Sequence, residues 1–72
     1  MEPTNEERAE TGMKALVGAG FSVMCREDLS DSIVDLVADL LHLARERDIE
    51  PDYVIHTATM HFDAEVDQEA TP

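Results

Sequence analysis

The apolar residues of this 72-residue chain recur at intervals of three and four positions over three segments, which places them on one face of a helix. The pattern predicts helices over about 5–20, 30–47 and 51–66. Residues 1–4 and 67–72 have no periodic apolar positions, so we expect a flexible N-terminus and a disordered acidic tail. The predicted fold is all-α: a single domain over 5–66, a three-helix bundle with disordered termini.

The first helix opens with a capping signal. Thr4 is followed three residues later by Glu7, a spacing at which each side chain bonds the backbone N–H group of the other. Its C-terminal half is harder to assign, because the glycines before Phe21 favour a helix end whereas Phe21 and Met24 look buried. We expect the helix to reach about Gly20, with Phe21 and Met24 covering the end of the bundle.

The second helix has the clearest pattern, and either Asp28 or Ser30 can cap its N-terminus. Its apolar positions are Leu29, Ile33, Val34, Leu36, Val37, Leu40, Leu41, Leu43 and Ala44. They cover about half of the circumference, which is wider than the stripe that one neighbouring helix needs. The helix is therefore either central in the bundle or also in contact with a second copy in a homodimer.

A short connection over 48–50 joins the second helix to the third. Pro51 fits the first turn of a helix, where its missing N–H group has no partner in any case. Because the connection is short, we expect the second and third helices to form an antiparallel hairpin. The predicted core face of the third helix consists of Val54, Ile55, Ala58 and Phe62.

Charge restricts the kinds of partner that the chain can have. Its 5 Lys and Arg residues and 17 Asp and Glu residues give a net charge of −12. A nucleic-acid-binding protein needs a basic stripe to displace counterions from phosphates, and an anionic membrane repels an acidic chain. We therefore expect no direct binding to nucleic acid and no membrane, and instead a protein partner with a basic surface.

The chain has no signal for export and no enzyme motif. It lacks a basic N-terminus followed by an apolar core and has no apolar run of the ~20 residues that a membrane span requires, so we expect it in the cytoplasm. Its one cysteine, Cys25, cannot form an internal disulfide and is expected to be a buried, inert thiol. Phosphate-binding, nucleophile-elbow and zinc-protease motifs are absent, so we predict no enzyme, no catalytic residue and no cofactor.

Polar residues line the face of the second helix that lies opposite its apolar positions: Asp31, Asp35, Asp39, His42 and Glu46. The simplest interpretation is a solvated, charged face. The functional interpretation is a surface that binds a basic protein, in one version by imitating the phosphate charge of nucleic acid, as inhibitors of host defence do.

The three histidines allow an alternative function. Helical spacing points His42 and His56 outward and places His61 on the apolar side, where we expect it to bond Glu65 one turn later. The alternative is a metal-binding module or metal-dependent hydrolase that uses Asp39, His42, His61 and Glu65, because imidazole and carboxylate groups are metal ligands.

About half of the chain resembles a pattern in small helical proteins encoded on bacterial plasmids, phages and integrated elements. The pattern is D-L-x-x-D-L-x-H, here Asp35 to His42, then a turn and A-x-x-H-[FY]-x-x-E, here Ala58 to Glu65. The chain departs from it at Asp48, where the pattern has a glycine. The resemblance implies an accessory protein of a mobile element and carries no assigned activity.

Overall fold

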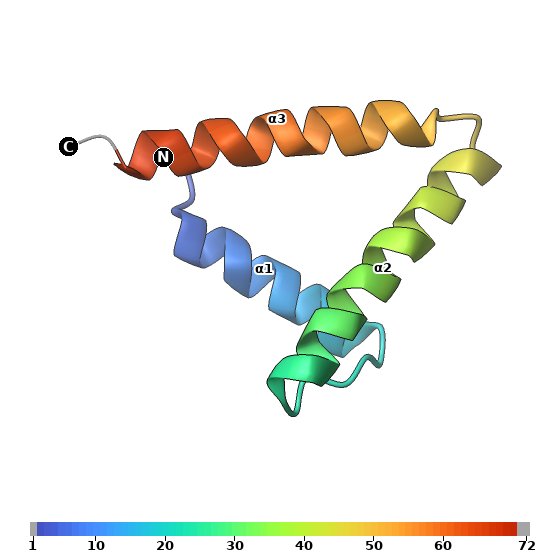
Figure 1. Ribbon diagram of the computed structural model, residues 1–72, viewed down its shortest axis with the longest axis horizontal. Coiled ribbons are helices and arrows are strands. Elements are labelled where there is room, and N and C mark those ends of the chain that lie inside the picture. The colour runs from blue at the N-terminus through green and yellow to red at the C-terminus, as the bar shows by residue number, and fades with distance from the viewer. Residues whose placement is uncertain (1, 71–72) are drawn as a thin grey trace.

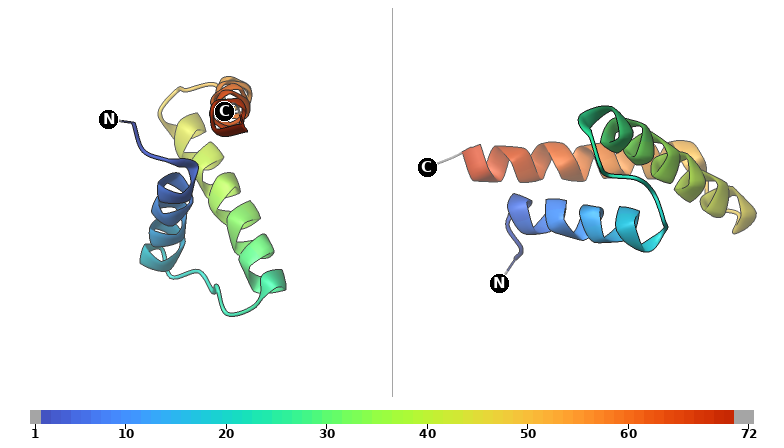
Figure 2. Two further views of the ribbon diagram at one scale, coloured as in Figure 1. Left: turned by 90° about the vertical axis from the view of Figure 1, so that its left-hand side faces the viewer. Right: turned by 90° about the horizontal axis from the view of Figure 1, so that it is seen from below.

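The computed structural model describes residues 2–70, apart from the side chain of Ala70, and this part of the chain contains three helices and no strand. The helices are α1 (Asn5–Gly18), α2 (Arg26–Glu46) and α3 (Pro51–Ala70). The predicted all-α, three-helix bundle is confirmed. Figure 1 shows the helices as the three sides of an open triangle. The further views in Figure 2 place the start of α1 beside the last turns of α3.

The predicted capping signal begins α1. The Glu7 N–H group donates to Thr4 Oγ1 at 3.1 Å, and the Thr4 N–H group donates to Glu7 Oε1 at 2.9 Å. The Thr4 backbone N–H, followed by its hydroxyl, holds the pKa of the Glu7 carboxyl below its ordinary value. Thr4 and Glu7 therefore cap the N-terminus of α1 as predicted.

Helix α1 ends at Gly18, two residues before the predicted end, because the chain reverses there in a Schellman motif. Gly20 has φ +86°, and its N–H group donates to Val17 O at 3.0 Å. The Phe21 N–H group donates to Leu16 O, also at 3.0 Å. The left-handed backbone at Gly20 needs a residue without a Cβ to avoid strain.

Helix α2 ends in the same backbone motif, although no glycine is present. Asp48 has φ +59°, and its N–H group donates to Arg45 O at 3.2 Å. The Ile49 N–H group donates to Ala44 O at 2.8 Å. Asp48 therefore takes a left-handed backbone conformation that glycine adopts most readily.

The N-terminus of α2 lies four residues earlier than predicted. The helix begins at Arg26, and Cys25 is its N-cap, with Sγ accepting from the Asp28 N–H group at 3.5 Å. The predicted caps, Asp28 and Ser30, lie inside the helix instead. Cys25 is exposed, so the expectation of a buried thiol is wrong.

Polar bonds fix the loop between α1 and α2. Ser22 Oγ donates to Asp28 Oδ2 at 2.8 Å, and the buried Ser32 hydroxyl donates to Ser22 O at 2.6 Å. These bonds hold the loop against the first turns of α2 and leave Met24 outside, 91% exposed. Phe21 is half-buried. The prediction that both side chains cover the end of the bundle is thus wrong for Met24.

Helix α3 begins at Pro51 as predicted and continues to Ala70. The predicted disordered tail over 67–72 is therefore helical over 67–70, and its last two residues lie outside the described part of the chain. No Gly or Pro interrupts this stretch, so it can extend the helix. Its Glu69 carboxylate also accepts a bond from the Asn5 N–H group at 2.7 Å.

Few side chains are buried. Among the described residues only Leu16 and Ala44 form a buried apolar core, at 4% and 6% exposure, and none is below 2%. The backbone carbonyl of each accepts a hydrogen bond where the chain reverses direction, Leu16 O from the Phe21 N–H group and Ala44 O from the Ile49 N–H group. On α2, Ile33 and Leu40 are 48% and 51% exposed, although both belong to the predicted core face. The apolar faces of the helices point to the inside of the triangle but do not pack together into a closed core.

Candidate functional site

The five polar residues predicted to bind a partner lie on α2, and all of them are exposed. We call this set the acidic ridge: Asp31, Asp35, Asp39, His42 and Glu46. At 1.5 Å of rise per residue, the ridge extends over about 22 Å, with about 6 Å between acids four positions apart. It lies on the side of the helix away from the apolar residues.

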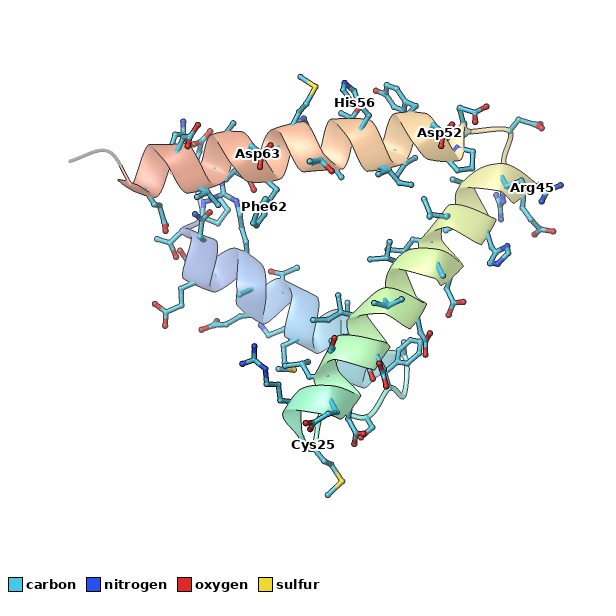
Figure 3. The ribbon with its side chains drawn as sticks, in the orientation of Figure 1. Cys25, Arg45, Asp52, His56, Phe62 and Asp63 are labelled. Carbon is cyan, nitrogen blue, oxygen red and sulfur yellow. The ribbon has the colours of Figure 1, made fainter. Side chains whose placement is uncertain are left out.

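The acidic ridge is not neutralised by any residue in the described range. No hydrogen bond or ion pair joins any of its five side chains to another residue of the described range 2–70. Arg45 lies on the same helix, and Figure 3 shows its side chain pointing outward at the corner of the triangle. The ridge carboxylates are therefore free to pair with cations on another molecule.

The structure places the three histidines on the surface. His42 and His56 are exposed as predicted, and Figure 3 shows His56 pointing away from the triangle. His61 is also exposed, so the prediction that it leans on the core is wrong. Its expected partner, Glu65, faces α1, where Glu65 Oε2 lies 3.4 Å from Arg8 Nε.

The alternative metal ligands are not brought together. Within residues 2–70, no three or more His, Cys, Asp or Glu side chains are close enough to hold one metal ion. Asp39 and His42 lie on the outer side of α2, whereas His61 and Glu65 lie on α3, which diverges from α2 beyond the turn (Figure 1). A metal site built from these four residues has no geometric support.

Sequence reasoning missed a polar cluster that joins the two ends of the triangle, which we call the clasp: Asn5, Arg8, Glu65 and Glu69. Asn5 donates from its backbone to Glu69 Oε1 at 2.7 Å and from Nδ2 to Glu65 O at 3.0 Å. Arg8 Nη1 donates to Asn5 Oδ1 at 2.9 Å. Glutamates near a helix C-terminus oppose its dipole, and this was the available signal that they needed a partner.

Two apolar grooves open onto the inside of the triangle. The groove between α1 and α2 has about 410 Å³ of space, and that between α2 and α3 has about 370 Å³. Val37 and Leu40 line both grooves, so the two grooves adjoin at these residues. Ile33 lines the first, and Ile55 and Phe62 line the second. Figure 3 shows Phe62 pointing from α3 toward α1. We call this surface the inner apolar face.

Comparison with protein-family models, with curated proteins and with solved structures found no match for this chain. Among the described residues, no helix combines the length and the apolar character needed to cross a membrane. The chain has two candidate binding surfaces, the acidic ridge and the inner apolar face.

Proposed function

We propose that this chain is a small acidic interaction module that binds a basic surface of another protein through the acidic ridge. The observation that carries the proposal is that all five ridge side chains are exposed and none is bonded to another described residue. The net charge of −12 adds a long-range field that attracts a basic partner and speeds the encounter.

The finer proposal is an accessory protein of a mobile element that modulates a host or element-encoded protein in the cytoplasm, as a homodimer and without catalysis. Its support is the resemblance carried by the segments from Asp35 to His42 and from Ala58 to Glu65. This role needs a partner and no cofactor.

One specific form of the proposal is mimicry of nucleic acid. Ridge acids four positions apart rise by about 6 Å, whereas the phosphates of one DNA strand repeat every ~3.4 Å along the axis. The ridge therefore corresponds to about every second phosphate of a strand, over a length of about 22 Å. In this form the ligand is the nucleic-acid-binding groove of a protein, and DNA should compete for it.

Affinity capture tests the proposal. The immobilised chain is incubated with bacterial lysate, and the bound proteins are identified by mass spectrometry at about 0.1 M and 0.5 M salt, where the Debye length falls from about 10 to about 4 Å. Asp35→Lys/Asp39→Lys reverses two ridge charges. Glu10→Lys/Asp63→Lys makes the same change in net charge at exposed positions on α1 and α3, and is the matched control.

We expect a basic protein that is captured at the lower salt and released at the higher. The ridge variant should bind it about tenfold or more weakly, whereas the control should change binding only modestly. Equal effects of the two variants would show that net charge acts without the ridge. Competition by added DNA distinguishes mimicry from binding at another basic surface.

A further inference from the structure

The single chain exposes more surface than a compact protein of its mass. Its accessible surface is 6157 Å². A compact monomer of 8.0 kDa exposes about 4,500 Å², so the excess is about 1,700 Å². The radius of gyration is 13.7 Å, against about 11 Å for a compact domain of 72 residues. Both quantities show that the single chain is less compact than a typical monomer of its size.

The inner apolar face is part of this exposed surface. Its lining contains no charged residue, and Thr59 is its one polar side chain. Ile33, Val37, Leu40 and Phe62 are 47% to 63% exposed, although each belongs to a continuous apolar surface. A contiguous exposed apolar patch on a folded protein often marks an interaction surface.

We infer that the inner apolar face is the interface of a homodimer, in which a second copy covers it across a two-fold axis. This assigns a surface to the homodimer proposed above and does not depend on the acidic ridge. If a second copy covered the whole excess, each copy would bury at most about 1,700 Å², and the total of about 3,400 Å² lies within the range of obligate homodimers.

A second copy fits this face better than another occupant does. The inner apolar face would complete the core that the single chain lacks, so the molecule that covers it must be present whenever the chain folds. A second copy of the chain meets this condition. The uncharged lining also lets two chains of charge −12 meet while the acidic ridges remain on the outside. Because Val37 and Leu40 are shared by both grooves, α2 lies at the centre of the interface and nearest the two-fold axis.

The clasp explains why the face stays open within one chain. The triangle has two corners joined by the chain, and the third is closed by the bonds of Asn5 and Arg8 to Glu65 and Glu69. These contacts are polar and hold α1 and α3 together at their ends. The middle sections of the three helices therefore present their apolar residues toward the centre, where a second copy can pack.

Two valines of α2 provide a matched test. Val37 lines both grooves and is 47% exposed, whereas Val34 lines neither and is 63% exposed. In a monomer both valines are partly exposed, so Val37→Asp and Val34→Asp should have similar, small effects. In the proposed dimer only Val37→Asp buries an unpaired charge, and dimer affinity should fall at least a hundredfold.

The measurements are molar mass by light scattering after size exclusion and thermal unfolding at several chain concentrations. We expect the natural chain at about 16 kDa, twice its 8.0 kDa, with a midpoint that rises by several degrees over a hundredfold increase in concentration. Val34→Asp and the ridge variant Asp35→Lys/Asp39→Lys should stay at this mass. Val37→Asp should no longer have the mass of a dimer, because it either becomes a helical monomer or unfolds as it dissociates.

The inference would be overturned if the natural chain were a monomer or a larger assembly. It would also be overturned if the midpoint of thermal unfolding did not depend on chain concentration. Equal effects of the two valine variants, or dissociation of the ridge variant, would do the same. A chain that is monomeric and yet captures its basic partner would overturn the dimer and leave the acidic ridge as the binding surface.

Discussion

Asp48 lies just after the end of α2 and has φ +59°, in the left-handed region of backbone conformation, where a residue with a Cβ is disfavoured. Gly20 occupies the equivalent position after α1, with φ +86°. The two helix ends make the same pair of backbone hydrogen bonds, so the residue type is the main difference between them. We predict that Asp48→Gly stabilises the fold and that Gly20→Ala destabilises it.

Three terms set the magnitude expected for Asp48→Gly. The left-handed conformation costs an L-residue about 1–2 kcal/mol, and Asp somewhat less. Removal of a carboxylate from the negative end of the α2 dipole adds about 0.3–1 kcal/mol of stability. The greater freedom of glycine in the unfolded chain subtracts about 0.5–1 kcal/mol. The Asp48 carboxylate bonds no other residue within 2–70, so these three terms sum to a net gain of about 1 kcal/mol.

Gly20→Ala isolates the backbone effect. A Cβ at Gly20 meets no other atom within 4 Å, so an alanine fits in space and its cost comes from φ alone. We expect a loss of about 1 kcal/mol. In a domain of this size, about 1 kcal/mol moves the thermal midpoint by about 4–8 °C.

Thermal and urea unfolding, followed by circular dichroism at one fixed chain concentration, measure both changes. Asp48→Asn separates the two causes, because it removes the charge and keeps a side chain that tolerates the left-handed region. We expect stability to increase from the natural chain to Asp48→Asn and again to Asp48→Gly. If the glycine variant were no more stable than the asparagine variant, the backbone strain would be no larger than the ~0.5–1 kcal/mol that the freedom of glycine costs in the unfolded chain, and the predicted net gain from the backbone would be refuted.

Two predictions concern the helix N-termini. Cys25→Ser should stabilise the chain by about 0.5–1 kcal/mol in urea unfolding, because a hydroxyl caps a helix better than a thiol whose Sγ lies 3.5 Å from the Asp28 N–H group. Cys25→Ala should bring no such gain. The pKa of Glu7 is lowered in the folded chain, so its stabilising effect is present above the unfolded pKa and is lost as pH falls through the folded pKa. Below pH 4.5, its ordinary value, the natural chain should therefore lose stability more steeply than Glu7→Gln, and parallel pH curves would contradict this.

Features that depend on residues close in sequence could be predicted. The pair of Thr4 and Glu7 identified the start of α1, and Pro51 identified the start of α3, because each cap is formed within one turn. The exposure of the acidic ridge followed from helical phase alone. These residues need no distant neighbour to take their positions.

The missed features depend on distant residues or on uncommon choices of residue. The clasp joins Asn5 to Glu69 across 64 positions, and no local pattern reports such a pairing. The clasp also takes Glu65 away from His61, which overturned the predicted pairing of those two residues. The start of α2 was placed too late because Cys25, an uncommon N-cap residue, precedes more favourable candidates within the helix.

The largest discrepancy is between periodicity and burial. The apolar pattern is strongest in the middle of α2, at residues such as Val37 and Leu40, yet these side chains are about half exposed. The buried apolar residues, Leu16 and Ala44, lie instead where the chain folds back on a helix end. Helical phase identifies which face is apolar and carries no information about what covers that face. Two corners are fixed by backbone bonds at the ends of α1 and α2, and the third by the polar bonds of the clasp, whereas the centres of the helices are apolar and open. This is the pattern that the proposed homodimer predicts, because its core would be completed by the second copy.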